Sequence, residues 1–224
     1  MVHNLFVIGI AGASGSGKTY LMEIIKNKIE NLFTEDYIET ISCDNYYYEN
    51  DTLNKDLPSS LELSLLVKHI TKLKNGETVE IPEYNFITQK REYNKNKIID
   101  GSKIKVLIVE GLFVLYDENI RNLLNLKLFT HLDEDITLAR RINRDTKERN
   151  KTFDNVIHEY KSFVKPAFIS IIKPSMIHAD MIVSTSETTD NTVYLDVIIQ
   201  YIRCKLKRKN WKLPLFIFYN HLVI

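Results

Sequence analysis

The stretch that decides the fold runs from Leu5 to Thr19 and reads LFVIGIAGASGSGKT. Its first part, Leu5 to Ile10, is a short apolar run rich in β-branched residues, which is typical of a strand buried on both faces. Its second part fits the pattern G-x-x-x-x-G-K-[ST], and the residues after it show an apolar stripe at helical spacing. A tight Gly/Ser-rich turn without a ligand is the alternative, but a glycine-rich loop between strand and helix is the setting in which this pattern binds phosphate. We therefore expect this protein to bind a nucleoside triphosphate.

The loop predicts particular roles for its residues. Glycines leave room for backbone N–H groups to surround a phosphate, and the N-terminus of the following helix adds partial positive charge. We expect the Lys18 ammonium to reach the β- and γ-phosphates and the Thr19 hydroxyl to bind Mg²⁺. The predicted nucleotide-binding residues are Gly12, Ala13, Ser14, Gly15, Ser16, Gly17, Lys18 and Thr19.

The composition is that of an ordinary globular protein. The chain has 224 residues, of which 44% are hydrophobic and 26% charged, and one domain is the natural expectation at this length. A formal net charge of +1 gives no reason to expect a nucleic-acid partner, and no apolar run approaches the length of a membrane span. The two cysteines lie too far apart to indicate a disulfide framework, and the first strand follows Met1 almost at once. We expect a cytoplasmic protein without a leader segment.

Apolar runs alternate with helical patterns along the chain, which predicts an α/β fold with a mostly parallel sheet and helices on both faces. The sequence predicts one domain over residues 1–206, with a β-hairpin at about 78–100 and a helical lid at about 135–152. Pro166 is expected to kink or divide its helix. The predicted strands are 5–10, 37–42, 105–109, 126–132 and 181–183, and the predicted helices are 20–33, 60–74, 133–149, 153–172 and 189–206.

The C-terminal segment 207–224 is strongly apolar and ends in KLPLFIFYNHLVI. It is expected to pack back on the sheet or on a neighbouring subunit, and a membrane surface or another partner is the alternative. Truncation after Leu206 should then lower the stability or the oligomer size. If neither changes, the segment contacts something outside the protein.

Two acidic residues follow predicted strands at the edge where ligands bind in such sheets. Glu110 comes directly after KVLIV, where a carboxylate can hold Mg²⁺, although it could also be an ordinary carboxylate in a Glu-Gly turn. Asp44 follows the second strand and is the candidate general base toward an attacking hydroxyl; the alternative is a helix or turn cap.

A basic cluster lies in the predicted lid. Phosphoryl transfer needs cations near the transferred group, and arginines supplied by a mobile lid, Arg141 and Arg144 here, would meet that need. A solvated helix face, with Asp145 and Glu148 as local ion-pair partners, is the alternative.

Eight motifs occur together in a fixed order from Phe6 to about Val183, and with them the chain resembles the uridine kinase (uridine–cytidine kinase) family of P-loop kinases. The resemblance implies the P-loop kinase fold with a β-hairpin at the acceptor site, the donor ATP or GTP with Mg²⁺, and a tetramer. The motifs are GASGSGKT, CDNYY, DLPSSLE, IPEYNF, IVEG, RRINRD with KERNK, EYKSFVKPAF and HADMIV.

The resemblance also implies roles for individual residues. Asp44 would be the catalytic base toward the 5′-hydroxyl of uridine or cytidine, with Lys18, Arg141 and Arg144 acting on the transferred group. Thr19 and Glu110 would serve Mg²⁺. The acceptor would be bound by Tyr47, Asp56, Tyr84, Phe86, Gln89, Arg149 and Glu159.

The chain departs from the family pattern on the acceptor side. Gln89 stands where the family has a histidine that reads the pyrimidine edge, and Glu159 replaces a glutamine. A carboxylate accepts hydrogen bonds only, which favours an amino group and so hints at cytidine or another acceptor. Asn150 and Lys151 replace a Gly-Arg pair of the lid, and Leu57 replaces a histidine.

Two other functions stay open at this point. One is the same phosphoryl transfer to another small hydroxylated acceptor, as in the phosphoribulokinase or pantothenate kinase families. The other is a nucleotide-binding regulator that does not catalyse. The presence of Asp44, Glu110 and Lys18 together favours an enzyme, because a regulator needs no acceptor-side base.

Overall fold

The structure is a computed structural model that describes residues 4–32, 37–49, 54–92, 94, 96–186 and 192–207. Contacts divide the chain into two compact units, Met1–Asn191 and Thr192–Ile224. Helix α7 (Thr192–Lys207) is the described part of the second unit. The apolar segment predicted to pack back, 207–224, lies outside the described residues apart from Lys207, so its role stays a prediction.

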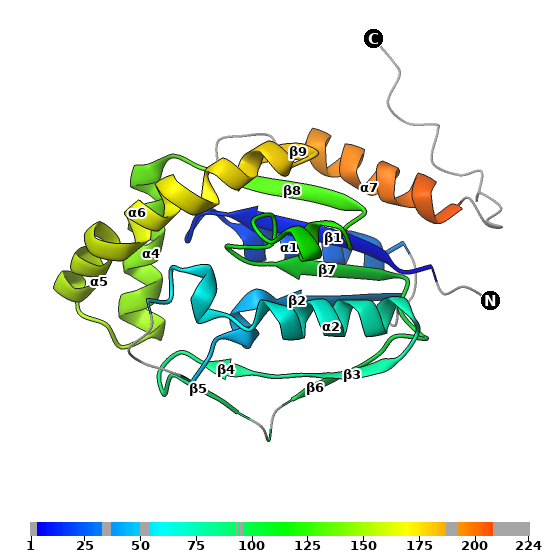
Figure 1. The fold of residues 1–224 in the computed structure, drawn as a ribbon. Coiled ribbons are helices and arrows are strands. Elements are labelled where there is room, and N and C mark those ends of the chain that lie inside the picture. Colours follow the sequence, from blue (N-terminus) through cyan, green and yellow to red (C-terminus); the bar gives the residue numbers. More distant parts are fainter. Residues whose placement is uncertain are drawn as a thin grey trace, which may run out of the picture. The chain divides into compact units, whose positions relative to one another are not determined.

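The first unit is built on a five-stranded sheet in which every neighbouring pair of strands is parallel, as the sequence predicts (Figure 1). Strand β1 lies at the centre, between β7 and β8. The order is β2-β7-β1-β8-β9, with bounds Phe6–Gly12 for β1, Ile38–Ser42 for β2, Val106–Glu110 for β7, Leu126–His131 for β8 and Met181–Ser184 for β9.

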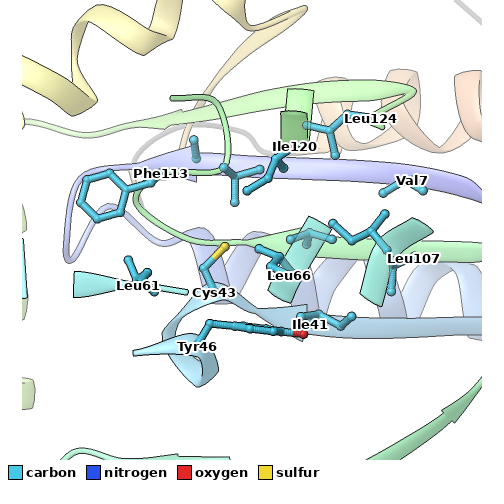
Figure 2. Packing of buried hydrophobic residues seen from close by; sticks show 14 of the residues in the cluster. Val7, Ile41, Cys43, Tyr46, Leu61, Leu66, Leu107, Phe113, Ile120 and Leu124 are labelled. Atoms are coloured by element: carbon cyan, nitrogen blue, oxygen red, sulfur yellow. The ribbon is translucent and has the colours of Figure 1, made fainter. Parts of the chain in front are cut away.

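Helices cover both faces of this sheet, which explains why the central strands are continuous apolar runs rather than alternating ones. Every residue of β1 and β7 is buried. Helix α1 (Lys18–Glu30) packs on β1, β2 and β7, whereas α2 (Leu63–Lys74) packs on the opposite face (Figure 1). There Leu66 of α2 meets Val7 and Leu107 of the sheet in the hydrophobic core that Figure 2 shows.

The predicted hairpin is present as two short antiparallel pairs. Strand β3 (Thr78–Ile81) pairs with β6 (Lys97–Asp100). Between them β4 (Tyr84–Asn85) pairs with β5 (Lys90–Arg91), a second pair that the sequence pattern did not separate because each strand has two residues.

The chain between β8 and β9 is helical, as predicted. It contains α4 (Glu134–Glu148), α5 (Phe153–Glu159), α6 (Lys165–Ala167) and the 3₁₀ turn Pro174–His178. Before β8 lie the short helix α3 (Glu118–Arg121) and the 3₁₀ turns Cys43–Tyr46 and Pro58–Ser60. Among the described residues, no helix is both long and apolar enough to cross a membrane.

Pro166 neither divides nor ends its helix. Val164 and Phe168, on either side, keep right-handed helical dihedral angles. Instead the hydrogen-bond pattern changes to π-type over Tyr160–Val164 and Phe168–Ile172. Proline removes one backbone donor and crowds the preceding turn, and a wider π-type turn accommodates it without a break.

Candidate active site

The phosphate loop joins the carboxyl end of β1 to the first turn of α1. Gly15 and Gly17 have φ angles of +84° and +83°, in the left-handed region that glycine adopts without strain. At Gly15 an added Cβ would lie 2.5 Å from the carbonyl oxygen of Thr137, so a larger residue would also collide there. Gly17 is the N-cap of α1, which leaves the unpaired N–H groups of that helix at the loop. The backbone therefore has the form that phosphate binding requires.

Two threonine side chains from outside the loop hold it by hydrogen bonds. Ser16 is fully buried, and its Oγ lies 2.6 Å from Oγ1 of Thr130, at the end of β8. Its carbonyl oxygen accepts a hydrogen bond of 2.6 Å from Oγ1 of Thr185, just after β9. These buried hydrogen bonds fix the loop before any ligand binds, which reduces the entropy lost on binding.

Lys18 and Glu110 are the charged pair at the phosphate end of the site. The Lys18 ammonium donates to the carbonyl oxygen of Ala13 at 2.9 Å. Desolvation lowers the pKa of Lys18, while the negative charges of Glu110 and Asp44 oppose that shift. Burial raises the pKa of Glu110, the Asp44 charge raises it further, and Lys18 opposes both. Each group of the pair thus favours the charged form of the other.

Ser42, at the end of β2, positions both acidic residues. Its Oγ donates to Oε1 of Glu110 at 2.7 Å and accepts from the backbone N–H of Asp44 at 3.3 Å. Ser42 is therefore the N-cap of the 3₁₀ turn Cys43–Tyr46. The cap role considered for the Asp44 side chain belongs to Ser42, and the Asp44 carboxylate lines the cavity instead.

Three aromatic rings form one wall of the cavity. The ring centroids of Tyr47 and Tyr84 lie 5.3 Å apart, and that of Phe86 lies 5.2 Å from Tyr84 and 6.0 Å from Tyr47. The Arg149 guanidinium lies 3.8 Å from the Phe86 centroid, and the Lys55 ammonium lies 5.2 Å from that of Tyr84. Such a wall suits a flat aromatic ligand that also accepts hydrogen bonds.

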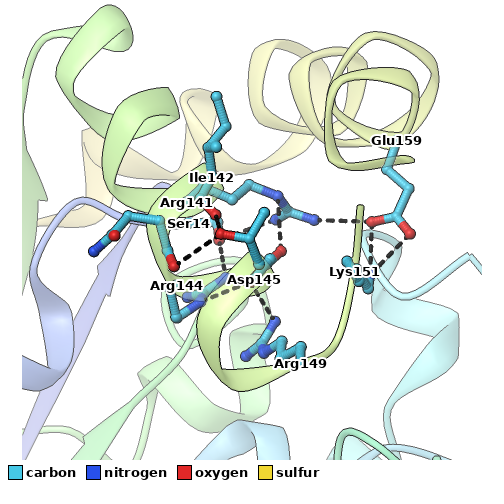
Figure 3. Close-up of polar contacts among 10 residues, drawn as sticks. Ser14, Arg141, Ile142, Arg144, Asp145, Arg149, Lys151 and Glu159 are labelled. Carbon is cyan, nitrogen blue, oxygen red and sulfur yellow. Dashed lines mark hydrogen bonds and ion pairs between the residues drawn. The ribbon is translucent and has the colours of Figure 1, made fainter. Parts of the chain in front are cut away.

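The lid arginines converge on one buried carboxylate, Asp145, which Figure 3 shows between them. Arg144, Arg149 and Arg141 lie 2.8, 3.3 and 3.4 Å from its oxygens. Arg141 also donates to Oγ of Ser14 in the phosphate loop at 3.0 Å, and Arg144 does so at 3.3 Å. Arg141 and Asp145 are buried, so they do not lie on a solvated face, whereas the local ion pairing expected of Asp145 is present.

Lys151 and Glu159 form a second charged group in the same network (Figure 3). The Lys151 ammonium donates to both carboxylate oxygens of Glu159, at 2.8 and 2.7 Å, and Arg141 lies 3.5 Å from one of them. Helix α4 ends at Glu148, and Asn150, with φ of +53°, turns the chain so that Lys151 lies beside Glu159. Glu159 is thus an ion-paired carboxylate. This weakens the sequence-based inference that Glu159 selects an acceptor with an amino group.

One cavity of about 390 Å³ brings the predicted residues together. It is lined by Ser14, Lys18 and Thr19 of the loop, whereas Gly12, Ala13, Gly15, Ser16 and Gly17 do not contribute to its wall. The other predicted residues that line it are Asp44, Tyr47, Asp56, Tyr84, Phe86, Gln89, Glu110, Arg141, Arg144, Arg149 and Glu159.

Five further residues line the cavity that the sequence did not assign to the site: Asn54, Lys55, Leu112, Lys151 and Phe163. Lys55 directly precedes Asp56, and Lys151 follows Arg149 by two positions, so proximity to a predicted site residue was a usable signal for both. Leu112 and Phe163 carry no polar group, and apolar wall residues cannot be told from core residues by sequence alone.

A family model described as the phosphoribulokinase/uridine kinase family matches residues 7–192. The chain belongs to this family. Uridine kinase from Pectobacterium atrosepticum is 34% identical over 88% of the chain and 93% of its own length, and that from Lactobacillus johnsonii is 36% identical over 89% and 95%. Uridine kinase-like protein 5 from Arabidopsis thaliana is 36% identical over 92% of the chain, which spans only 44% of that longer protein.

Solved structures of other proteins share the fold of this chain at low sequence identity. A candidate fructose transport system kinase from Silicibacter matches 80% of the chain and 89% of its own length, with a TM-score of 0.66 and 17% identity. YFH7 from Saccharomyces cerevisiae matches 84% and 95%, with a TM-score of 0.57 and 13% identity. The fold is that of the P-loop kinases, and family membership carries nucleotide binding with it.

Proposed function

We propose that this protein is a nucleoside kinase that transfers the γ-phosphoryl group of ATP or GTP to the 5′-hydroxyl of uridine or cytidine. The observation that carries the proposal is the set of groups that line one cavity. Lys18 of the phosphate loop, the Asp44 carboxylate and the aromatic wall all line it, and the Asp44 charge acts on both Lys18 and Tyr47. The uridine kinases among its relatives support this assignment.

The residues present fit a nucleotide and a magnesium ion. Thr19 and Glu110 both line the cavity beside Lys18, and one hydroxyl with one carboxylate is a typical protein contribution to Mg²⁺ bound to phosphates. Bound there, Mg²⁺ would neutralise charge on the phosphates. Ser42 holds the Glu110 carboxylate in place by its hydrogen bond.

The remaining chemistry belongs to the chain's own side chains. Asp44 accepts the proton of the 5′-hydroxyl as that oxygen attacks the γ-phosphorus. Lys18, Arg141 and Arg144 stabilise the charge that develops on the transferred group. Both arginines donate to Oγ of Ser14, which holds their guanidinium groups at the phosphate loop.

On the acceptor side, we propose that Tyr47, Tyr84 and Phe86 enclose the pyrimidine and that Asp56 accepts hydrogen bonds from ribose hydroxyls. Gln89, Arg149 and Glu159 complete the site, the last through its ion pair with Lys151. A homotetramer is a further proposal from the family resemblance, and a cytoplasmic location is a further proposal from the composition. Light scattering after size-exclusion chromatography tests the tetramer.

The first experiment is phosphate transfer from ATP-Mg²⁺ to a panel of uridine, cytidine, adenosine, pantothenate and ribulose 5-phosphate. Turnover of uridine or cytidine is expected. Turnover of another acceptor alone would keep the phosphate site and replace the acceptor assignment. Tight ATP binding with no turnover of any acceptor would favour a regulator that binds nucleotide without catalysis.

A further inference from the structure

Arg91, the last residue of β5, contacts three groups from other parts of the chain. Its Nε donates to the carbonyl oxygen of Tyr47 at 3.1 Å, and its Nη2 donates to that of Tyr46 at 3.0 Å. Its Nη1 pairs with the carboxylate of Glu62, just before α2, at 2.8 Å. The Arg91 side chain is only 12% exposed, so the guanidinium is largely shielded from water, although the Glu62 side chain is 30% exposed. Hydrogen bonds from an ionised donor in such surroundings are among the strong ones.

The two carbonyl groups belong to the segment that carries the proposed base. Asp44 and Tyr46 lie in the same 3₁₀ turn, and Tyr47 follows it directly. Tyr46 and Tyr47 are buried, so their carbonyl groups need hydrogen-bond partners within the protein. Arg91 supplies a partner to each, and the backbone N–H of Glu62 supplies a second to Tyr46 at 2.9 Å.

The other end of the connection is the hairpin that carries Tyr84 and Phe86 of the aromatic wall. Arg91 lies directly opposite Tyr84 in the β4–β5 pair. Tyr84, Phe86 and Gln89, all from this hairpin, line the cavity, whereas Arg91 does not. A single guanidinium therefore links the turn that carries Asp44 to the hairpin that carries Tyr84 and Phe86, from outside the cavity.

We propose that Arg91 is a positioning residue of the acceptor site, which sets the separation between the segment that carries Asp44 and Tyr47 and the hairpin that carries Tyr84 and Phe86. Its planar guanidinium reaches two neighbouring carbonyl groups and a carboxylate at once, which the single ammonium of a lysine on a flexible stem cannot reproduce. The proposal rests on the proposed function, because the acceptor wall has its role only if a nucleoside binds there.

Arg91→Ala is expected to raise the KM for the nucleoside and to lower kcat, with kcat/KM for the nucleoside falling on the order of 10- to 100-fold. The KM for ATP should not change, because no contact of Arg91 reaches the phosphate loop. Steady-state kinetics with each substrate varied in turn measures the difference. A KM for ATP that rises as much as that for the nucleoside would overturn the proposal, since it would mean general loss of structure.

Two further measurements separate positioning from folding. Low millimolar guanidinium should restore part of the nucleoside kcat/KM of Arg91→Ala, whereas the same concentration of sodium or potassium should not. Arg91→Lys keeps the charge and stem, and it should lie between wild type and Arg91→Ala. Should Arg91→Ala not fold, Arg91→Lys carries the test alone, and a nucleoside kcat/KM equal to wild type would then refute the proposal.

Arg121 provides the matched control. It also donates to two backbone carbonyl groups, those of Leu115 and Tyr116, but it lies on α3 and does not line the cavity. Arg121→Ala should leave kcat/KM for the nucleoside within about two-fold of wild type. A loss in Arg121→Ala equal to that in Arg91→Ala would contradict a specific role for Arg91.

Hydrogen exchange distinguishes failure of this inference from failure of the proposed function, because it needs no activity. In Arg91→Ala the amides of Tyr48 and Glu62, which bond across the segment that Arg91 holds, should exchange faster, and those of α1 should not. Unchanged exchange at these amides would reject the positioning role even in an active enzyme. Faster exchange in a protein that phosphorylates no nucleoside would reject only the proposed function.

Discussion

At the residue scale, the two ends of the cavity differ in how their charges are held. The pKa shifts of Lys18 and Glu110 are opposite in sign: desolvation lowers the pKa of Lys18, and burial raises that of Glu110. Tyr47 is held as a neutral phenol, because burial raises its pKa well above 10.0. Its hydroxyl donates to the carbonyl oxygen of Lys55 at 3.0 Å. Burial thus favours the neutral phenol at Tyr47, whereas at Lys18 and Glu110 the charge of the other group opposes the effect of burial.

Asp44→Asn tests the proposed base. The amide cannot accept the proton, so kcat is expected to fall by about 10²- to 10⁴-fold, the usual contribution of a general base. ATP binding should stay within a few-fold of wild type, because Lys18 and the loop are unchanged. Single-turnover kinetics and calorimetric titration with ATP measure the two effects. Full activity would remove Asp44 from the base role.

Gln89→His tests whether this position reads the base. Gln89 has φ of +55°, and histidine is among the residues that adopt this region more readily, so the change adds little backbone strain. The ratio of kcat/KM values for cytidine and uridine is expected to shift. Gln89→Asn, which keeps the amide and tolerates the same φ, is the control and should shift the ratio less. An unchanged ratio in the histidine variant would mean that residue 89 does not contact the base.

At the element scale, the lid is organised by a carboxylate rather than by its arginines. Helix α4 presents Arg141, Arg144 and Asp145 together, and Arg149 returns to the same carboxylate just after the helix ends. Burial by itself would raise the pKa of Asp145, but the charges of the three guanidinium groups outweigh it and lower that pKa below 3.8. Without this carboxylate the three arginines would repel one another.

Asp145→Asn should therefore lower both the activity and the stability of the protein. Breaking a buried ion pair costs about 3–5 kcal/mol, and here three cations lose one partner. We expect kcat/KM to fall at least ten-fold and the free energy of unfolding to decrease. Asp154→Asn, an exposed acidic residue in the first turn of α5, is the matched control and should have little effect on either. Equal losses in both variants would contradict the central role of Asp145.

Wild type and Asp145→Asn also give a test of pH dependence with a defined sign. A carboxylate whose pKa is lowered by folding stabilises the folded state above its unfolded-state pKa, and that contribution is lost as the pH falls through the folded-state value. The difference in unfolding free energy between wild type and Asp145→Asn should be constant near neutral pH. It should shrink as the pH falls below about 3.8. A difference that instead grows toward acid would contradict the lowered pKa.

At the scale of the whole molecule, the first unit places its site by topology. Strand β1 lies between β7 and β8, and the chain leaves it through α1 to reach β2 on one side, while β9 lies on the other. In open parallel sheets, ligands bind beyond the carboxyl ends of the strands where the connections diverge. The phosphate loop, Ser42 and Glu110 all lie at that edge, because parallel strands bring their carboxyl ends together (Figure 1).

Nucleotide binding should therefore be measurable as global stability. A ligand that binds only the folded protein stabilises it by about 2.7 kcal/mol at one hundred times its Kd. ATP with Mg²⁺ is expected to raise Tm by several degrees, and Lys18→Ala should abolish most of the rise while Asp44→Asn keeps it. Differential scanning calorimetry measures the shift. A wild-type protein whose Tm does not respond to saturating nucleotide would contradict the assignment of the phosphate loop.

Much of the fold and of the site could be predicted because the relevant signals are local. The run Leu5 to Ile10 is apolar on both faces, and G-x-x-x-x-G-K-[ST] encodes a backbone shape through its own glycines. The order of the motifs then predicted the family, and with it most of the residues that line the cavity. These features depend on neighbours in the chain, so the sequence by itself determined them.

What the tertiary structure decided are the partners of charged and buried groups. Ser14 is 127 residues from Arg141, and Arg91 is 44 residues from Tyr47, yet each pair is in contact. The ion pair of Lys151 with Glu159 depends on where α4 ends and on the left-handed turn at Asn150. No sequence spacing encodes such contacts, because strand register and helix packing set them, and both are properties of the folded chain as a whole.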